Sequence, residues 1–171
     1  MTLSLRTALM EKLKLYLETS LFGFYFDRSA SNRTKSNAVR KLFQQIRDGL
    51  FEGYVSGLVR VELAKAPPPY RGRLLGLIDL YRLKAVDYDA DEVGDLHEEY
   101  MEARVVPLSV ADDAAHVAIA TLAGMDVVVS CNLKHLANEL AARRFQAVNL
   151  RQGYGSNLSI RQPEEIVIYE D

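Results

Sequence analysis

Short apolar runs with the character of buried strands alternate along this chain with longer helical patterns, and this alternation narrows the possible folds more than any other feature. The clearest run is Asp126-Val127-Val128-Val129-Ser130, whose three consecutive valines are typical of a strand covered on both faces. Two further β-prone runs are Lys14-Leu15-Tyr16-Leu17-Glu18, after which a Thr-Ser pair predicts a polar loop, and Tyr54 to Val59. Because parallel strands are joined by crossover helices, the alternation predicts an α/β domain with a central parallel sheet.

Helical periodicity is present in the segments between these runs. From Asn32 to about Asp48, apolar residues recur at spacings of 3, 4 and 7 residues, and Gly49 closes the pattern. The triple proline at 67–69 ends any helix that contains Glu62, because proline lacks the backbone N–H and its ring clashes with the preceding turn. Further helices are predicted at 70–82, 93–103 and 112–123, of which the last is the clearest.

The length of the chain fits a single domain. A chain of 171 residues is predicted to form one domain over residues 1–171, in which residues 1–13 are an N-terminal extension ahead of the first strand. Met10 could itself be an initiator, which leaves open whether residues 1–9 belong to the native protein. Hydrophobic residues make up 49% and charged residues 26% of the chain, which excludes wholesale disorder, a collagen-like repeat and a coiled-coil rod.

Cysteine usage and hydropathy indicate the compartment. Cys131 is the single cysteine, so it cannot form an internal disulfide, and the chain lacks the paired Cys or Cys/His spacing of a structural zinc site. No stretch approaches the roughly 18 uninterrupted apolar residues of a membrane span, and the N-terminus has no clean signal-peptide core. We therefore expect a cytoplasmic protein with no membrane partner.

Positive and negative charges nearly balance overall, but they are concentrated in different segments of the chain. The net charge is −2, so the whole molecule has no strong attraction to polyanions. Residues 28–50 carry six basic residues against Asp48 alone, whereas residues 85–103 carry eight acids and no Lys or Arg. Two interpretations of the basic segment remain open at this point, a solvated helix face or a surface that contacts phosphates.

Four polar residues are predicted to lie at the carboxyl ends of the strands, where ligands bind in parallel α/β sheets. Each has an ordinary structural explanation by itself, such as a helix cap, a turn residue or a surface helix residue. Only their convergence would make a site. The four are Glu18 after the first strand, Glu62 after the second, Asp113 at the start of a helix, and Asn132 after the valine strand.

The ordered set of motifs resembles the PIN-domain ribonucleases, a family whose most numerous members are the toxin subunits of bacterial type II toxin–antitoxin pairs. The resemblance runs from about Lys14 to Val167. Its parts are Tyr16-Leu17-Glu18-Thr19-Ser20, Val61-Glu62-Leu63, Asp113-Ala114-Ala115-His116-Val117-Ala118-Ile119-Ala120, Ser130-Cys131-Asn132-Leu133-Lys134-His135-Leu136, and the closing Gln162-Pro163-Glu164-Glu165-Ile166, which is similar to the family's last loop and strand.

The resemblance implies a PIN-like three-layer α/β/α domain with a central parallel sheet of about five strands. It also implies a divalent-metal-dependent endoribonuclease in which Glu18, Glu62 and Asp113 bind one or two Mg²⁺ or Mn²⁺ ions and Asn132 is the fourth catalytic residue. Hard cations of this kind take oxygen ligands and can lower the pKa of a bound water for attack on a phosphodiester. Most of the family has Asp where this chain has Glu18, so the geometry of metal binding is expected to differ.

Further residues are assigned supporting roles. His116 lies three residues after Asp113, on the same helix face, and is expected to be a core histidine or to orient a site carboxylate. Asp112 is expected to cap the same helix beside the site, although the roles of the neighbours Asp112 and Asp113 could be reversed. Residues predicted to position the RNA substrate are Thr19, Ser20, Lys134 and His135 beside the acids and a basic rim of Arg33, Lys35, Arg40, Arg71 and Arg73.

Partners and alternatives follow from the same resemblance. It suggests a homodimer and, for a toxin, a small antitoxin protein that blocks the site with an Arg directed at the acids. The alternative is a catalytically weak or silent PIN-like module that binds nucleic acid or a protein partner. A nucleotide-binding domain of the Rossmann or flavodoxin type lacks support, because neither a Gly-x-Gly-x-x-Gly turn nor a Gly-x-x-x-x-Gly-Lys-Ser/Thr loop is present.

Overall fold

The described part of the chain contains one sheet in which all strands run parallel. The computed structural model describes residues 11–132, 136–155 and 157–170, and these contain five strands in the order β3-β2-β1-β4-β5. The predicted α/β class with a parallel sheet of five strands is confirmed. The strands are β1 (Lys14–Leu17), β2 (Glu52–Val55), β3 (Lys84–Ala85), β4 (Val127–Val129) and β5 (Ser159–Arg161).

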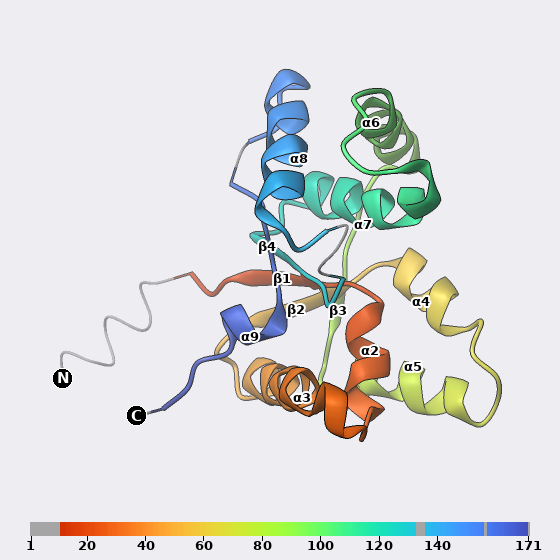
Figure 1. Ribbon diagram of the computed structural model, residues 1–171, viewed down its shortest axis with the longest axis vertical. Coiled ribbons are helices and arrows are strands. Elements are labelled where there is room, and N and C mark those ends of the chain that lie inside the picture. The colour runs from red at the N-terminus through yellow and green to blue at the C-terminus, as the bar shows by residue number, and fades with distance from the viewer. Residues whose placement is uncertain (1–10, 133–135, 156, 171) are drawn as a thin grey trace.

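Helices cover both faces of this sheet, which gives the expected three layers (Figure 1). One layer contains α6, α7 and α8, and the opposite layer contains α2, α3 and α5, with α9 packed against α3. The helices are α2 (Ser20–Phe26), α3 (Arg33–Arg47), α4 (Gly57–Leu63), α5 (Tyr70–Leu80), α6 (Ala90–Glu102), α7 (Ala111–Leu122), α8 (Glu139–Arg151) and α9 (Pro163–Ile166).

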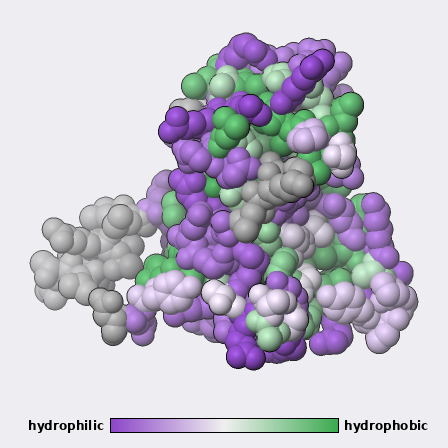
Figure 2. Space-filling view, viewed as in Figure 1, coloured by the Kyte–Doolittle hydropathy of each residue, from purple (hydrophilic) through white to green (hydrophobic). Residues whose placement is uncertain are grey.

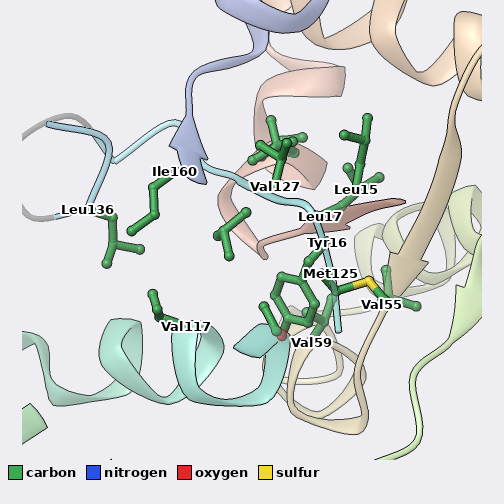
Figure 3. Packing of buried hydrophobic residues seen from close by; sticks show 14 of the residues in the cluster. Leu15, Tyr16, Leu17, Val55, Val59, Val117, Met125, Val127, Leu136 and Ile160 are labelled. Atoms are coloured by element: carbon green, nitrogen blue, oxygen red, sulfur yellow. The ribbon is translucent and has the colours of Figure 1, made fainter. Parts of the chain in front are cut away.

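The central strands are buried on both faces, as their unbroken apolar sequences require. Leu15, Tyr16 and Leu17 of β1 have no exposed surface, and Val127 to Val129 of β4 are also buried. Figure 3 shows β1 and β4 side chains packing with Val117 from α7 on one side and with Ile160 from β5. Burial of a side chain of this size contributes about 1.5–3 kcal/mol, so these two short strands anchor both helical layers.

The strand order places a topological switch point beside β1. From β1 the chain builds outward to β2 and β3, and it then returns to add β4 and β5 on the other side. β1 pairs with β4 in the register Leu17↔Val129, so the two strands end at the same level. In open parallel sheets such a point leaves a crevice outside the carboxyl ends of the strands, where ligands bind.

Two predicted boundaries near the first strands are wrong. The polar loop expected after Glu18 is the start of helix α2, whose Leu21 and Phe22 are fully buried. The β-prone run from Tyr54 to Val59 leaves the sheet at Val55, because the Ser56 side chain accepts a hydrogen bond from the Val59 N–H and starts helix α4. Both corrections place a helix directly after a strand, next to the switch point.

The C-terminal third also differs from the prediction. Gln162 to Ile166 is not a loop and strand but helix α9, because Pro163 occupies the first helical position and the Gln162 and Glu165 side chains form a capping box. The last strand, β5, comes just before it. Helix α8 and strands β3 and β5 were not predicted. The N-terminal residues 1–10 lie outside the described residues, and residues 11–13 precede β1 without regular structure.

Polar residues cover most of the surface visible in Figure 2, with an apolar patch at the end formed by α6 and α8. A groove of about 440 Å³ lies there, lined by Met101, Arg104, Val105, Val106, Pro107, Leu108 and Arg144. No helix among the described residues is long and apolar enough to cross a membrane.

The packing of β2 makes a direct stability prediction. A Cβ on Gly53 would lie 2.7 Å from Leu83 Cδ2 and 2.9 Å from Ile46 Cγ2, both on buried side chains. Gly53→Ala is therefore expected to lower the free energy of unfolding by about 1–3 kcal/mol, measured by urea denaturation.

Gly76→Ala is the matched control, because Gly76 is an exposed position in α5 where an added Cβ meets nothing within 4 Å. It should raise the stability by about 0.5–1 kcal/mol. Equal effects of the two changes would contradict the packing described for Gly53.

Candidate functional site

Glu18 lies at the switch point, between the ends of β1 and β4. Its backbone N–H donates to the Val129 carbonyl (3.1 Å), which continues the pairing of the two strands by one residue. The residue is 5% exposed, and its carboxylate accepts hydrogen bonds from the Ser130 hydroxyl (2.9 Å) and the Ser20 N–H (3.1 Å), as well as from the Ser20 hydroxyl. A buried carboxylate of this kind is tolerated because polar groups surround it.

Asp113 and Asn132 are joined across the same edge of the sheet. Asp113 lies in the first turn of α7, and its Oδ2 accepts a hydrogen bond from the Asn132 amide Nδ2 at 2.7 Å. The Asn132 backbone N–H donates to the Ser130 hydroxyl at 3.0 Å, so Ser130 connects this pair to Glu18. The turn after β4 therefore supplies two of the contacts that hold the acids.

Glu62 is held from two sides at the end of α4. Its Oε1 accepts a hydrogen bond from the Thr19 hydroxyl at 2.8 Å and lies 2.5 Å from Nε2 of the buried His116. Thr19 directly follows Glu18, and His116 comes from α7. Glu62 is therefore held by the residue next to Glu18 and by α7, the helix that carries Asp113.

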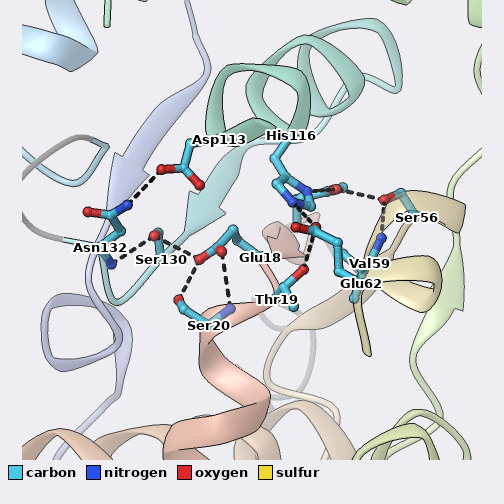
Figure 4. A network of polar contacts seen from close by, with 11 residues as sticks. Glu18, Thr19, Ser20, Ser56, Val59, Glu62, Asp113, His116, Ser130 and Asn132 are labelled. Carbon is cyan, nitrogen blue, oxygen red and sulfur yellow. Dashed lines mark hydrogen bonds and ion pairs between the residues drawn. The ribbon is translucent and has the colours of Figure 1, made fainter. Parts of the chain in front are cut away.

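The four residues predicted to form the site lie in one connected region (Figure 4). We call this set the carboxylate network, meaning Glu18, Glu62, Asp113 and Asn132 with the side chains that bridge them, Thr19, Ser20, Ser130 and His116. Within the ranges that the structure describes, no Lys or Arg donates a hydrogen bond to Glu18 or Glu62. The same ranges contain no three His, Cys, Asp or Glu side chains close enough together to hold a metal ion as they stand.

The residues beside the acids differ in how they relate to this network. Thr19 and Ser20 contact the carboxylates, as described above. Asp112 was expected to cap α7, and this is wrong, because the cap position is Val110 and Asp112 is an exposed residue within the first turn. Lys134 and His135 lie outside the described residues.

The predicted basic rim is partly engaged with the protein itself. Lys35 Nζ binds Glu164 (3.0 Å) and Gln162 (3.1 Å), and Arg71 Nε donates to the Ala66 carbonyl (2.9 Å). Arg33 is exposed at the start of α3. The other two members have local contacts: Arg40 donates to the Tyr25 carbonyl, and the Arg73 guanidinium lies over the Phe26 ring.

The environment shifts the pKa values of Glu62 and of Cys131, the residue between Ser130 and Asn132. Burial raises the pKa of Glu62, but its contacts with His116 and Thr19 outweigh this effect, so this pKa lies below its ordinary value of 4.5. Burial raises the pKa of the Cys131 thiol to about 12, against a smaller opposing effect of the Lys35 charge. Glu62 is therefore held as a carboxylate, and Cys131 is a protonated, unreactive thiol at neutral pH.

Three residues with polar contacts here were not singled out from the sequence. Ser130 could have been found, because it is the first polar residue after the buried valine strand at the same edge as Asn132. Tyr16 and Ser56 carried no such signal, since each lies inside a run that was predicted as a strand. In the structure, the Tyr16 hydroxyl contacts both Ser56 and His116.

Neither the family models nor the curated proteins contain a match to this chain.

The role of Ser130 makes a stability prediction. Ser130→Ala removes a hydroxyl that donates to a buried carboxylate and accepts from the Asn132 N–H. Hydrogen bonds to charged groups contribute about 1.5–3 kcal/mol, and chemical denaturation should show a loss in this range. Ser36→Ala is the control, because Ser36 is equally buried and its hydroxyl has no hydrogen-bond partner in the described part of the chain. A Ser36→Ala loss as large as that of Ser130→Ala would contradict the assignment.

The lowered pKa of Glu62 predicts a pH dependence. A group whose pKa is lower in the folded state stabilises the fold above its unfolded pKa, and this contribution is lost as the pH falls through the folded pKa. Glu62→Gln should therefore be less stable than the wild type at neutral pH, and the difference should shrink as the pH falls below 4.5. Urea denaturation at a series of pH values tests this, with the exposed change Glu98→Gln in α6 as control. A difference that stays constant down to pH 3 would rule out the predicted role.

Proposed function

We propose that this chain is a divalent-metal-dependent endoribonuclease of the PIN-domain type, which hydrolyses RNA phosphodiester bonds at the carboxylate network. The observation that carries the proposal is the connection of Glu18, Glu62, Asp113 and Asn132 at the switch point of a parallel sheet. Each of these side chains has an ordinary explanation by itself. Together they form a cluster of oxygen-bearing side chains that come from the end of β1, α4, α7 and the turn after β4, and a metal site with oxygen ligands requires such a cluster.

The donor set suits a hard divalent cation. Three carboxylates and one amide are the oxygen ligands that Mg²⁺ and Mn²⁺ favour. Glu18, Glu62 and Asp113 would hold the ion, and Asn132 would orient Asp113 through the hydrogen bond already present. Because no three of the described acidic, His or Cys side chains converge closely enough in this state, ion binding requires the carboxylates to move together. A bound ion supplies a water of lowered pKa and positive charge beside the phosphodiester.

The remaining residues fit recognition of a phosphate chain. Thr19 and Ser20 present hydroxyls beside the acids, and Lys35 of α3 contacts Gln162 and Glu164, just after the carboxyl end of β5. Arg33 and Arg71 are exposed on α3 and α5. Cations at the edge of an acidic site attract RNA without neutralising the acids themselves.

A second candidate is a PIN-like module with a weak or silent site that binds nucleic acid or a protein. One observation favours it: both oxygens of Glu18 already accept hydrogen bonds, from Ser20 and Ser130. A carboxylate in this state must give up at least one donor before it can bind a metal. The antitoxin and the homodimer belong to the toxin version of the main proposal, and their support is the sequence resemblance.

The test is RNA cleavage with matched variants. The purified protein is incubated with a labelled pool of single-stranded and hairpin RNAs in Mn²⁺, in Mg²⁺ and in EDTA. We expect cleavage by the wild type with either metal and none in EDTA. Asp113→Asn and Glu62→Gln should each lose at least about 100-fold in rate, because each removes one negative ligand of the proposed ion.

Asp112→Asn is the matched control, since Asp112 is exposed in the same helical turn as Asp113. It should cleave at the wild-type rate, and circular dichroism should show every variant folded. Cleavage that survives in Asp113→Asn would reveal a contaminating nuclease or another site. Intact RNA in all lanes, with a gel shift, would favour the silent binding module.

A further inference from the structure

A chain of buried polar contacts extends from Glu62 into the core. His116 Nε2 lies 2.5 Å from Glu62 Oε1, and His116 Nδ1 lies 2.6 Å from the Tyr16 hydroxyl. The Tyr16 hydroxyl in turn lies 2.7 Å from the Ser56 hydroxyl. Tyr16, Ser56 and His116 are each at most 1% exposed, so bulk water does not take part in these contacts. Figure 4 shows the chain running from Glu62 through His116 to Ser56.

The contacts close into a ring through helix α4. Ser56 is the N-cap of this helix, where its hydroxyl accepts a hydrogen bond from the Val59 N–H at 3.2 Å. Glu62 lies near the other end of the same helix. The start and the end of α4 are therefore both tied, through Tyr16 of β1 and His116 of α7, to the elements that carry Glu18 and Asp113.

The number of available protons determines which group donates and which accepts in each of these hydrogen bonds. Ser56 already accepts from Val59, so its own proton is used only if it donates to the Tyr16 oxygen. The Tyr16 proton then points to His116 Nδ1, which must be an acceptor, and the proton of a neutral His116 lies on Nε2, facing Glu62. With a proton on Nδ1 instead, Tyr16 would donate to Ser56, and the buried Ser56 proton would have no acceptor among these groups.

We propose that Ser56, Tyr16 and His116 act as a positioning device, in which Tyr16 fixes His116 as the Nε2–H tautomer so that it holds Glu62 Oε1 from the side opposite Thr19. This inference rests on the proposed function, because it concerns how Glu62 serves a metal-binding site. Two donors, His116 and Thr19, engage Oε1 and fix the carboxylate plane. Oε2 has no hydrogen-bond partner in the described ranges and is the oxygen available to an ion.

A positioning role explains why the Tyr16 hydroxyl and the His116 imidazole are found in the core. An apolar residue in place of Tyr16 or His116 would avoid the desolvation cost of a buried hydroxyl and imidazole. Removal of a residue that hydrogen-bonds to a metal-binding side chain typically lowers the metal affinity by about 10–100-fold. A purely structural role would instead affect folding stability and leave metal affinity unchanged.

The central experiment removes one oxygen atom. Tyr16→Phe deletes the hydroxyl that donates to His116 and keeps the aromatic ring in the core. We expect Mn²⁺ alone, titrated by isothermal calorimetry, to bind this variant about 10-fold more weakly than the wild type. Tyr100→Phe is the control, because Tyr100 is equally buried and its hydroxyl contacts Asn149 and Thr121 away from the carboxylate network. It should lower thermal stability to a similar extent without changing Mn²⁺ affinity.

Two substitutions of His116 separate its contacts. The amide nitrogen of Gln reaches the position of Nε2, so His116→Gln can still donate to Glu62, whereas the shorter Asn reaches only the position of Nδ1. Mn²⁺ affinity should therefore be closer to wild type in His116→Gln than in His116→Asn. Equal losses in the two variants would contradict a positioning role and favour a structural one.

The tautomer is measured independently of the metal. The chain has three histidines, so long-range ¹H–¹⁵N correlations of the rings can be assigned by comparison with His116→Gln. The wild type should show a protonated Nε2 and an unprotonated Nδ1, and Tyr16→Phe should show a mixture. A wild type with the proton on Nδ1, or Mn²⁺ affinity unchanged in Tyr16→Phe, overturns the positioning device. Failure of the wild type to bind Mn²⁺ instead overturns the proposed function on which it rests.

Discussion

The parallel pairing of β1 with β4 is the constraint on which the candidate site depends. The register Leu17↔Val129 ends the two strands at one level, and the hydrogen bond from the Glu18 N–H to the Val129 carbonyl extends it by one residue. Glu18 and Ser130 therefore leave the sheet side by side. A slip of one residue would turn the Glu18 side chain to the other face, because successive side chains alternate along a strand. The apolar strands that exclude water thus also set the position of the first carboxylate.

The other acids reach this place because helices begin close to the strand ends. Ser56 stops β2 and caps α4, whose length brings Glu62 to the Thr19 hydroxyl. Asp113 lies in the first turn of α7, where the positive end of the helix dipole favours a carboxylate. Hydroxyls, one backbone N–H and the His116 ring, rather than Lys or Arg, supply the described contacts to Glu18 and Glu62. This arrangement holds the Glu18 and Glu62 carboxylates in place without a hydrogen bond from any described Lys or Arg, and carboxylates held in this way favour the binding of a divalent cation.

Much of the fold follows from sequence pattern, and the errors have specific causes. The β1 and β4 runs and helix α3 were predicted because long or unbroken apolar patterns leave few alternatives. Helix α2 was missed because its seven residues are mostly aromatic and apolar, without a helical polar face. Four candidate residues were recognised from their positions after predicted strands or at a helix start. The partnership of Tyr16 with His116 joins residues 100 positions apart in the chain, and no local pattern carries such a contact.

The longer side chain of Glu18 is fixed in place by hydrogen bonds from neighbouring residues. Where most PIN-domain ribonucleases have Asp, the extra methylene adds a rotatable bond and moves the carboxylate outward by about one carbon–carbon bond. Ser20 and Ser130 donate to that carboxylate from α2 and from the end of β4, so the added freedom is removed in the folded state. The same hydroxyls compete with an ion for the Glu18 oxygens. Glu62 is held differently, with both described donors on Oε1. In the proposed enzyme, Glu62 is thus the prepared ligand, and Glu18 is the ligand that must exchange hydroxyl donors for the metal.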